Sequence, residues 1–217
     1  MPHISVRRLA SQEILEEFLG ALQSDGVVRN VFVVGGDPST PEGPYSDSLQ
    51  VIRTGLLQQF GCEHVSISGY PEGHPDISST LLWEAIESKS AALDVAGLPG
   101  TIITQFGFDV DAVITWIEAV RGRGIELPIR IGVPGPAGIK RLISYASRFG
   151  VASSAGIAKK YGFSLTNLVG TAGPDRFIRE LDRRLESSHG EIKLHFYTFG
   201  GLRATQEWIT SFERERT

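Results

Sequence analysis

The sequence predicts an α/β protein of the (β/α)8 type, a TIM barrel with about six of the eight strand–helix units in its 217 residues. Apolar runs of strand length alternate with segments of helical apolar spacing, and short connections between them require a parallel sheet. A barrel would also gather at one mouth the polar and aromatic residues that end the strands: Asp37, Tyr70, His74, Gln105 and Tyr197. An open doubly wound sheet is the alternative, but no Gly-x-Gly-x-x-Gly follows the first strand, which argues against a Rossmann dinucleotide site.

Composition predicts a single globular domain over residues 1–217, with 41% hydrophobic and 21% charged residues. A net charge of −4 argues against a general nucleic-acid binder, which needs a basic surface for phosphate. Without a bilayer-length apolar run or an apolar signal core, the protein is expected to be cytoplasmic and not bound to a membrane, and a homo-oligomer is compatible with the sequence. The single Cys62 excludes an intrachain disulfide and a zinc site built on several cysteines, so it is expected to be a reduced, packed thiol.

The first strand–helix unit is predicted from residue 3 onward. Residues 3–6 form a short strand, and we interpret residues 11–14 as a capping box that starts a helix at Ser11. The inward face of that helix is expected to hold five apolar residues at helical spacing: Ile14, Leu15, Phe18, Leu19 and Leu22.

The second strand, at residues 30–34, is almost entirely apolar, which is typical of a strand buried on both faces. It ends in Gly-Gly-Asp-Pro at 35–38. A loop through Tyr45 then leads to one helix with four apolar residues: Leu49, Ile52, Leu56 and Leu57.

The third strand, at residues 63–68, alternates polar and apolar residues and leads into a loop that carries three chemically useful side chains. Tyr70, Glu72 and His74 lie between glycines and prolines, and the prolines restrict the backbone around Tyr70 and His74. The pattern fits a ligand site and a simple Pro/Gly-rich turn about equally well. A helix is expected at residues 78–95.

The second half of the chain repeats the alternation. Strands are expected at residues 101–104, 127–131 and 192–197. The strand at 101–104 is followed by a helix with four apolar residues at core spacing: Val113, Trp116, Ile117 and Val120. A helix through Tyr145 follows the strand at 127–131, and a helix containing Trp208 and Ile209 follows the strand at 192–197. Residues 151–162 are predicted to be irregular, before an amphipathic helix at about 174–185 that buries Phe177, Ile178, Leu181 and Leu185.

Five motifs together resemble the methylenetetrahydrofolate reductase family over nearly the whole chain. They are Pro-His-Ile-Ser at 2–5, Gly-Asp-Pro at 36–38, Gly-Tyr-Pro-Glu-Gly-His-Pro at 69–75, Thr-Gln-Phe-Gly-Phe-Asp at 104–109 and Leu-His-Phe-Tyr-Thr at 194–198. The resemblance implies a (β/α)8 barrel with FAD across its mouth. In that family the flavin takes a hydride from NADH or NADPH and passes it to methylenetetrahydrofolate; the reverse oxidation is the same chemistry run backward.

The resemblance also implies roles for individual residues. The flavin contacts carry over to His3, Gly36, Asp37, Tyr45, Ser46, Tyr70, His74 and Lys89. Gln105 matches the glutamine that hydrogen-bonds the pterin, and Tyr197 is expected on the substrate side. Asp37 matches a catalytic aspartate beside the flavin and the folate, where a carboxylate limits stabilisation of the reduced ring. Lys89 would neutralise a pyrophosphate oxygen, although a helical lysine can equally be a solvated surface charge.

The chain also departs from the family pattern. Gly35, Leu82, Ala85 and Gly201 stand where the family has polar or charged residues, although Arg203 is close to the last. The family has two further strand–helix units before the strand containing His3, and the first supplies the glutamate that acts as general acid. We expect residues 1–217 to lack both units, and with them this general acid. Glu72 is a poor substitute for the missing glutamate unless its loop folds inward.

Three interpretations follow from these features. The favoured one is a flavin-dependent reductase whose N-terminal part is missing from these residues. The second is a short paralogue that binds flavin or folate as a binding module or subunit without reducing it. The third, a barrel fragment that serves only in assembly, ranks last. Such a scaffold would not need Asp37, Gln105 and His74, which are all present.

Overall fold

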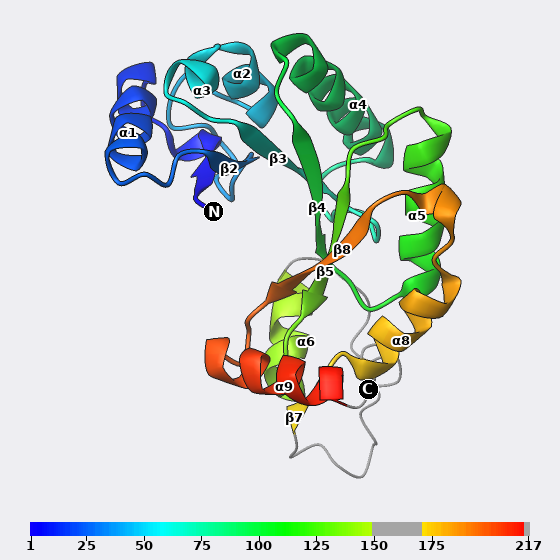
Figure 1. The fold of residues 1–217 in the computed structure, drawn as a ribbon. Coiled ribbons are helices and arrows are strands. Elements are labelled where there is room, and N and C mark those ends of the chain that lie inside the picture. The colour runs from blue at the N-terminus through cyan, green and yellow to red at the C-terminus, as the bar shows by residue number, and fades with distance from the viewer. Residues whose placement is uncertain (149–170, 215–217) are drawn as a thin grey trace. The chain divides into compact units, whose positions relative to one another are not determined.

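The computed structural model describes residues 1–148 and 171–214, which form two compact units (Figure 1). Unit 1 comprises Met1–Gly69 and Thr80–Ile103, and unit 2 comprises Tyr70–Ser79 and Thr104–Thr217. The irregular stretch predicted at 151–162 lies outside the described residues.

Parallel strands form the centre of unit 1. Strand β1 (His3–Ser5) pairs with β2 (Asn30–Val34), in a register that sets His3 opposite Phe32. Strand β2 pairs in turn with β3 (His64–Gly69). Strand β4 (Gly100–Phe106) begins in this unit and ends in unit 2. The alternation expected in β3 is only partial, because Ser66 is buried along with the apolar residues on either side of it.

The helices of unit 1 confirm some predictions and correct others. They are the 3₁₀ turn η1 (Val6–Arg8), α1 (Gln12–Ser24), α2 (Ser48–Arg53), α3 (Leu56–Gln59) and, apart from its first residue, α4 (Ser79–Ala96). The single helix expected through Leu57 is two helices, because Gly55 between them adopts a left-handed backbone with φ of 77°. An apolar pattern that continues past such a glycine cannot reveal the break.

Helix α1 differs from prediction at its cap and on its inner face. The Ser11 hydroxyl accepts a hydrogen bond from the amide of Ile14 at 3.4 Å, as a helix cap should. The capping box is wrong, however, because its third helical position is Ile14, whose side chain cannot return a hydrogen bond. Leu15 and Leu19 are fully buried, whereas Ile14 and Phe18 remain 45% and 38% exposed, so the buried stripe is narrower than expected.

The remaining elements belong to unit 2. The end of β4 is followed by β5 (Ile129–Pro134), which pairs in parallel with β8 (Ile192–Tyr197) along its whole length. The helices are α5 (Val110–Gly122), α6 (Ile139–Arg148), α8 (Asp175–Arg184), the 3₁₀ turn η2 (Ser187–His189) and α9 (Leu202–Arg214). A short antiparallel pair joins β6 (Ala137–Gly138) to β7 (Thr171–Ala172). An ion pair between Arg184 and Asp111 links α8 to α5.

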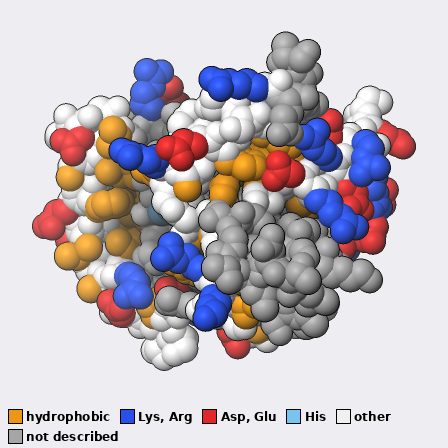
Figure 2. All heavy atoms as spheres, turned by 90° about the horizontal axis from the view of Figure 1, so that it is seen from below, with side chains coloured by type: hydrophobic (Ala, Val, Ile, Leu, Met, Phe, Trp, Pro, Cys, Tyr) orange, Lys and Arg blue, Asp and Glu red, His pale blue; other side chains and the backbone are white. Residues whose placement is uncertain are grey.

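The six main strands follow the order β1-β2-β3-β4-β5-β8, and every pair whose register is known is parallel. This confirms the predicted α/β class and is consistent with a partial (β/α)8 barrel. None of the helices formed by residues 1–148 and 171–214 has the length and apolar character needed to cross a bilayer. On the face shown in Figure 2, basic and acidic side chains are interspersed.

Cys62 is a free thiol, 5% exposed, at the end of the turn after α3. Desolvation raises its pKa to about 11, so the thiol stays protonated at neutral pH. The predicted packed, reduced cysteine is confirmed.

Candidate functional site

The loop after β2 is tied to the segment after β1 by Arg7. The guanidinium of Arg7 donates from Nε to the Ser46 carbonyl at 2.7 Å and from Nη1 to the Pro38 carbonyl at 3.1 Å. The backbone amide of Arg7 donates to the Gly35 carbonyl at 2.9 Å. The loop that carries Gly36, Asp37, Tyr45 and Ser46 is therefore held at both ends by one residue. Sequence reasoning missed Arg7, since nothing in the sequence distinguishes it from a solvated arginine.

Gly36 shows how closely this loop approaches β1. Its φ of 95° is a left-handed conformation, and a Cβ atom at this position would lie 2.0 Å from Ser5 Oγ. Only glycine fits here. The neighbouring Asp37 is exposed, so its carboxylate is open to solvent at the end of β2.

Ser46 and Tyr45 have different surroundings. The amide and hydroxyl of Ser46 both donate to Gln50 Oε1, at 2.6 and 3.1 Å, beside the capping box that Asp47 makes with Gln50 at the start of α2. Tyr45 is only 6% exposed, and its hydroxyl is buried without a hydrogen-bond partner in the part of the chain that the structure describes. Desolvation, with the charges of Glu16 and Glu13, raises the pKa of Tyr45.

Burial lowers the pKa of two basic side chains of unit 1, although His3 is exposed and Lys89 is only partly buried. The His3 ring packs edge-on against Phe32, with 4.9 Å between ring centroids, and desolvation lowers the pKa of His3. Lys89 lies on α4, and desolvation lowers its pKa while the charge of Asp47 opposes that shift. The Lys89 side chain is thus partly buried on α4.

In unit 2, the loop after β3 is ordered by its own contacts. The amide of Gly73 donates to the Tyr70 carbonyl at 3.1 Å, which closes a turn. The rings of Tyr70 and His74 meet edge to face, with centroids 5.4 Å apart. His74 Nδ1 accepts from the amide of Asp76 at 3.2 Å, so the proton of a neutral ring lies on Nε2 and is available to a ligand.

Glu72, in the same loop, reaches the turn between β4 and α5. Its Oε1 accepts hydrogen bonds from the amides of Phe108 and Asp109, at 2.6 and 2.9 Å. Asp109 in turn caps α5 through its carboxylate, which accepts from the amides of Asp111 and Ala112. The sequence offered Glu72 only as a poor proton donor and did not predict this contact.

Gln105 and Tyr197 lie near the ends of β4 and β8. Gln105 is partly buried within β4 rather than just after it, and its Oε1 accepts from the amide of Phe106 at 3.1 Å. The Tyr197 hydroxyl donates to the Thr104 carbonyl at 3.1 Å, so it can still accept a hydrogen bond from a ligand. Burial, and secondarily the nearby Tyr70, raises the pKa of Tyr197.

A sequence model described as methylenetetrahydrofolate reductase matches residues 1–211, nearly the whole chain. The chain belongs to this family.

A Schizosaccharomyces pombe protein named methylenetetrahydrofolate reductase 1 is 31% identical over 208 residues, covering 87% of this chain and 31% of the relative. A 5,10-methylenetetrahydrofolate reductase from Pectobacterium carotovorum is 29% identical over 145 residues, 64% of this chain and 44% of its own length. Methylenetetrahydrofolate reductase (NADH) 1 of Arabidopsis thaliana is 29% identical over 150 residues, 62% of this chain and 24% of its own length. The chain therefore spans less than half of the length of each of these relatives.

The site residues suggested by the family motifs are divided between the two units. Unit 1 holds His3, Gly36, Asp37, Tyr45, Ser46 and Lys89, whereas unit 2 holds Tyr70, His74, Gln105 and Tyr197. Of the positions that depart from the reductase pattern, Leu82 and Ala85 lie partly buried on α4, and Gly201 has a φ of 100° just before α9.

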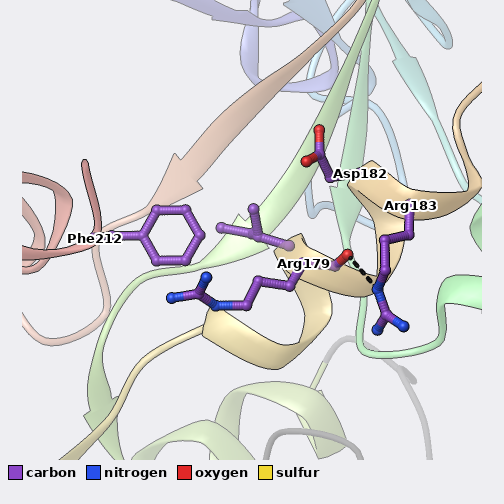
Figure 3. A pocket seen from close by; sticks show the side chains of 5 residues that line it. Arg179, Asp182, Arg183 and Phe212 are labelled. Atoms are coloured by element: carbon purple, nitrogen blue, oxygen red, sulfur yellow. Dashed lines mark hydrogen bonds between the residues drawn. The ribbon is translucent and has the colours of Figure 1, made fainter. Parts of the chain in front are cut away.

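A hollow of about 260 Å³ between α8 and α9 holds none of these residues (Figure 3). The guanidinium carbon of Arg179 lies 4.8 Å from the centre of the Phe212 ring there, and Arg183 Nε donates to the Arg179 carbonyl at 3.1 Å. The side chains of Ile178 and Asp182 complete the lining.

Proposed function

We propose that this chain takes part in the reduction of 5,10-methylenetetrahydrofolate to 5-methyltetrahydrofolate by NADH or NADPH, with FAD as the cofactor. The observation that carries the proposal is the family match over residues 1–211, within which the glutamine and tyrosine–histidine motifs lie at strand ends. The curated relatives carry the reductase name, and some of them are named as NADH forms. FAD supplies the capacity to accept a hydride from the nicotinamide and pass it to the folate.

The residues of unit 1 fit an anionic dinucleotide. Lys89 is partly buried on α4, burial lowers its pKa, and the described residues give its ammonium no hydrogen bond or close ion pair. A pyrophosphate oxygen would give it a charge contact. Gly36 lets the loop after β2 pass close to β1, and the exposed carboxylate of Asp37 follows it directly.

The residues of unit 2 fit the flavin ring and the pterin. His74 offers an Nε2 proton, and Tyr70 is held against it edge to face. Gln105 presents an amide with two donors and an acceptor, which matches the amide edge of a pterin. Its side chain would orient the folate. The proposed role of Asp37, a residue of unit 1, is to disfavour negative charge on the reduced flavin. Glu72 is assigned no proton transfer, because its Oε1 already accepts two amide hydrogens.

Replacing Gln105 by Ala should weaken folate binding and leave FAD binding unchanged. The loss should be about 1–3 kcal/mol, since the polar edge of a buried pterin would lose its partner. Isothermal titration with 5-methyltetrahydrofolate and a separate FAD titration would measure the two affinities. Gln206→Ala is the matched control, because Gln206 is exposed on α9 and should leave both affinities unchanged. Equal loss of both ligands in Gln105→Ala would mean that Gln105 supports the fold rather than the substrate.

A further inference from the structure

A carboxylate oxygen of Glu72 links two loops of unit 2. One loop carries Tyr70 and His74, and the other is the turn that follows Gln105 on β4. Glu72 Oε1 joins them by accepting the amides of Phe108 and Asp109, at 2.6 and 2.9 Å. Hydrogen bonds to an acidic side chain are stronger and shorter than those between neutral groups.

Gly107 makes room for this contact. A Cβ atom on Gly107 would lie 2.6 Å from Glu72 Oε1 and 3.4 Å from its Cδ, so a side chain there would push the carboxylate away. The φ of Gly107 is not in the left-handed range, so backbone freedom does not explain the glycine. The space taken by Glu72 does explain it.

The turn is also fixed on its other sides. The amide of Gly107 donates to the Gly132 carbonyl at 3.2 Å, and Asp109 caps α5. The Tyr70–His74 loop has its own turn and ring contact, and Glu72 adds two hydrogen bonds to the turn after β4. A movement of Glu72 would remove these two hydrogen bonds to a turn that is itself anchored to β5 and α5.

We propose that Glu72 is a positioning residue that holds the Tyr70–His74 loop to the end of β4, so that the flavin-side and folate-side contacts are set together. This inference rests on the proposed function for the identity of the two ligands. The hydrogen bonds to the two amides do not depend on it. In this role Glu72 acts on the ligands through Tyr70, His74 and Gln105.

Hydrogen exchange without ligand tests the contact itself. In Glu72→Ala, exchange of the Phe108 and Asp109 amides should accelerate about tenfold or more, as loss of a charged acceptor implies. The Gly132 amide, which donates to Thr104 Oγ1 at 2.8 Å, should keep its exchange rate and serves as the internal control. Unchanged exchange at Phe108 and Asp109, or equal acceleration at Gly132, would overturn the proposal.

Ligand binding tests the coupling. In Glu72→Ala, the dissociation constants for FAD and for 5-methyltetrahydrofolate should both rise about fivefold or more, and Gly107→Ala should have the same effect with Glu72 intact. Glu72→Gln should recover both affinities to within about twofold, because its amide oxygen still accepts hydrogen bonds. Glu63→Gln, which alters an exposed pair with Arg29, is the control and should change neither.

The outcomes separate this inference from the proposed function. Loss of one ligand affinity without the other, or no recovery in Glu72→Gln, would contradict the positioning role. If the unaltered chain bound neither FAD nor the folate, the proposed function would fail, and the exchange measurement alone would decide whether Glu72 holds the two loops together.

Discussion

Replacing Phe106 by Ala should lower the free energy of unfolding by about 3–5 kcal/mol, the usual cost of removing a buried aromatic ring. Phe106 is 1% exposed and follows Gln105 at the end of β4. Its ring meets those of Phe108, Tyr197 and Phe199 edge to face, with centroids 6.0, 5.3 and 5.0 Å away. The deletion removes apolar contacts and leaves a cavity under the candidate site.

Urea unfolding, followed by tryptophan fluorescence, would measure this loss. Phe18→Ala is the control, because Phe18 is 38% exposed on α1 and should cost about 1 kcal/mol or less. Similar losses in the two variants would contradict the position of Phe106 at the centre of this aromatic cluster.

Adding one methyl group at Gly132 should cost about 2–3 kcal/mol or more, because the group has nowhere to go. A Cβ atom in Gly132→Ala would lie 2.5 Å from the Thr104 carbonyl oxygen and 2.8 Å from both the carbonyl carbon and oxygen of Gln105. These are backbone atoms of β4, which cannot rotate away as a side chain could. The strand must move, and Gln105 moves with it, so folate affinity should fall together with stability.

Gly122→Ala is the matched control for this change. No atom outside the local helix backbone lies within 4 Å of the Cβ position at Gly122, the last residue of α5, and alanine favours a helix by up to about 1 kcal/mol relative to glycine. Thermal unfolding should therefore show opposite shifts in the two variants. A Gly132→Ala protein as stable as the original would mean that β4 and β5 are farther apart than described.

Local pattern predicted much of the fold. Strands β2 and β8 have the predicted bounds, because each is a run of strand-forming residues between clear turn signals. The core face of α5 was also predicted correctly, since Val113, Trp116, Ile117 and Val120 are all buried. The errors arose where tertiary packing decides. Strand β4 continues through Gln105 and Phe106, and β5 occupies 129–134 instead of the predicted 127–131. The outer part of the apolar stripe on α1 is exposed to solvent.

The candidate site was predictable only in its motif residues. Arg7 and Glu72 act over sequence separations of 39 and 37 residues, through backbone groups that carry no side-chain signature. An arginine after a strand and a glutamate in a turn have many possible roles, and only the folded chain shows which atoms they reach. The close packing of Gly36 on Ser5 is likewise a tertiary fact, although glycine in the loop was noted from the sequence.

Titration of the purified chain with FAD, followed by flavin fluorescence anisotropy, tests the central claim most directly. FAD should bind saturably and stoichiometrically. FMN should bind more weakly, because it lacks the pyrophosphate bridge expected to meet Lys89. Lys89→Met should reduce FAD affinity toward that of FMN, because it keeps the length of the side chain and removes its charge. No change in anisotropy on adding FAD, or equal binding of FAD by Lys89→Met, would contradict the proposed flavin site.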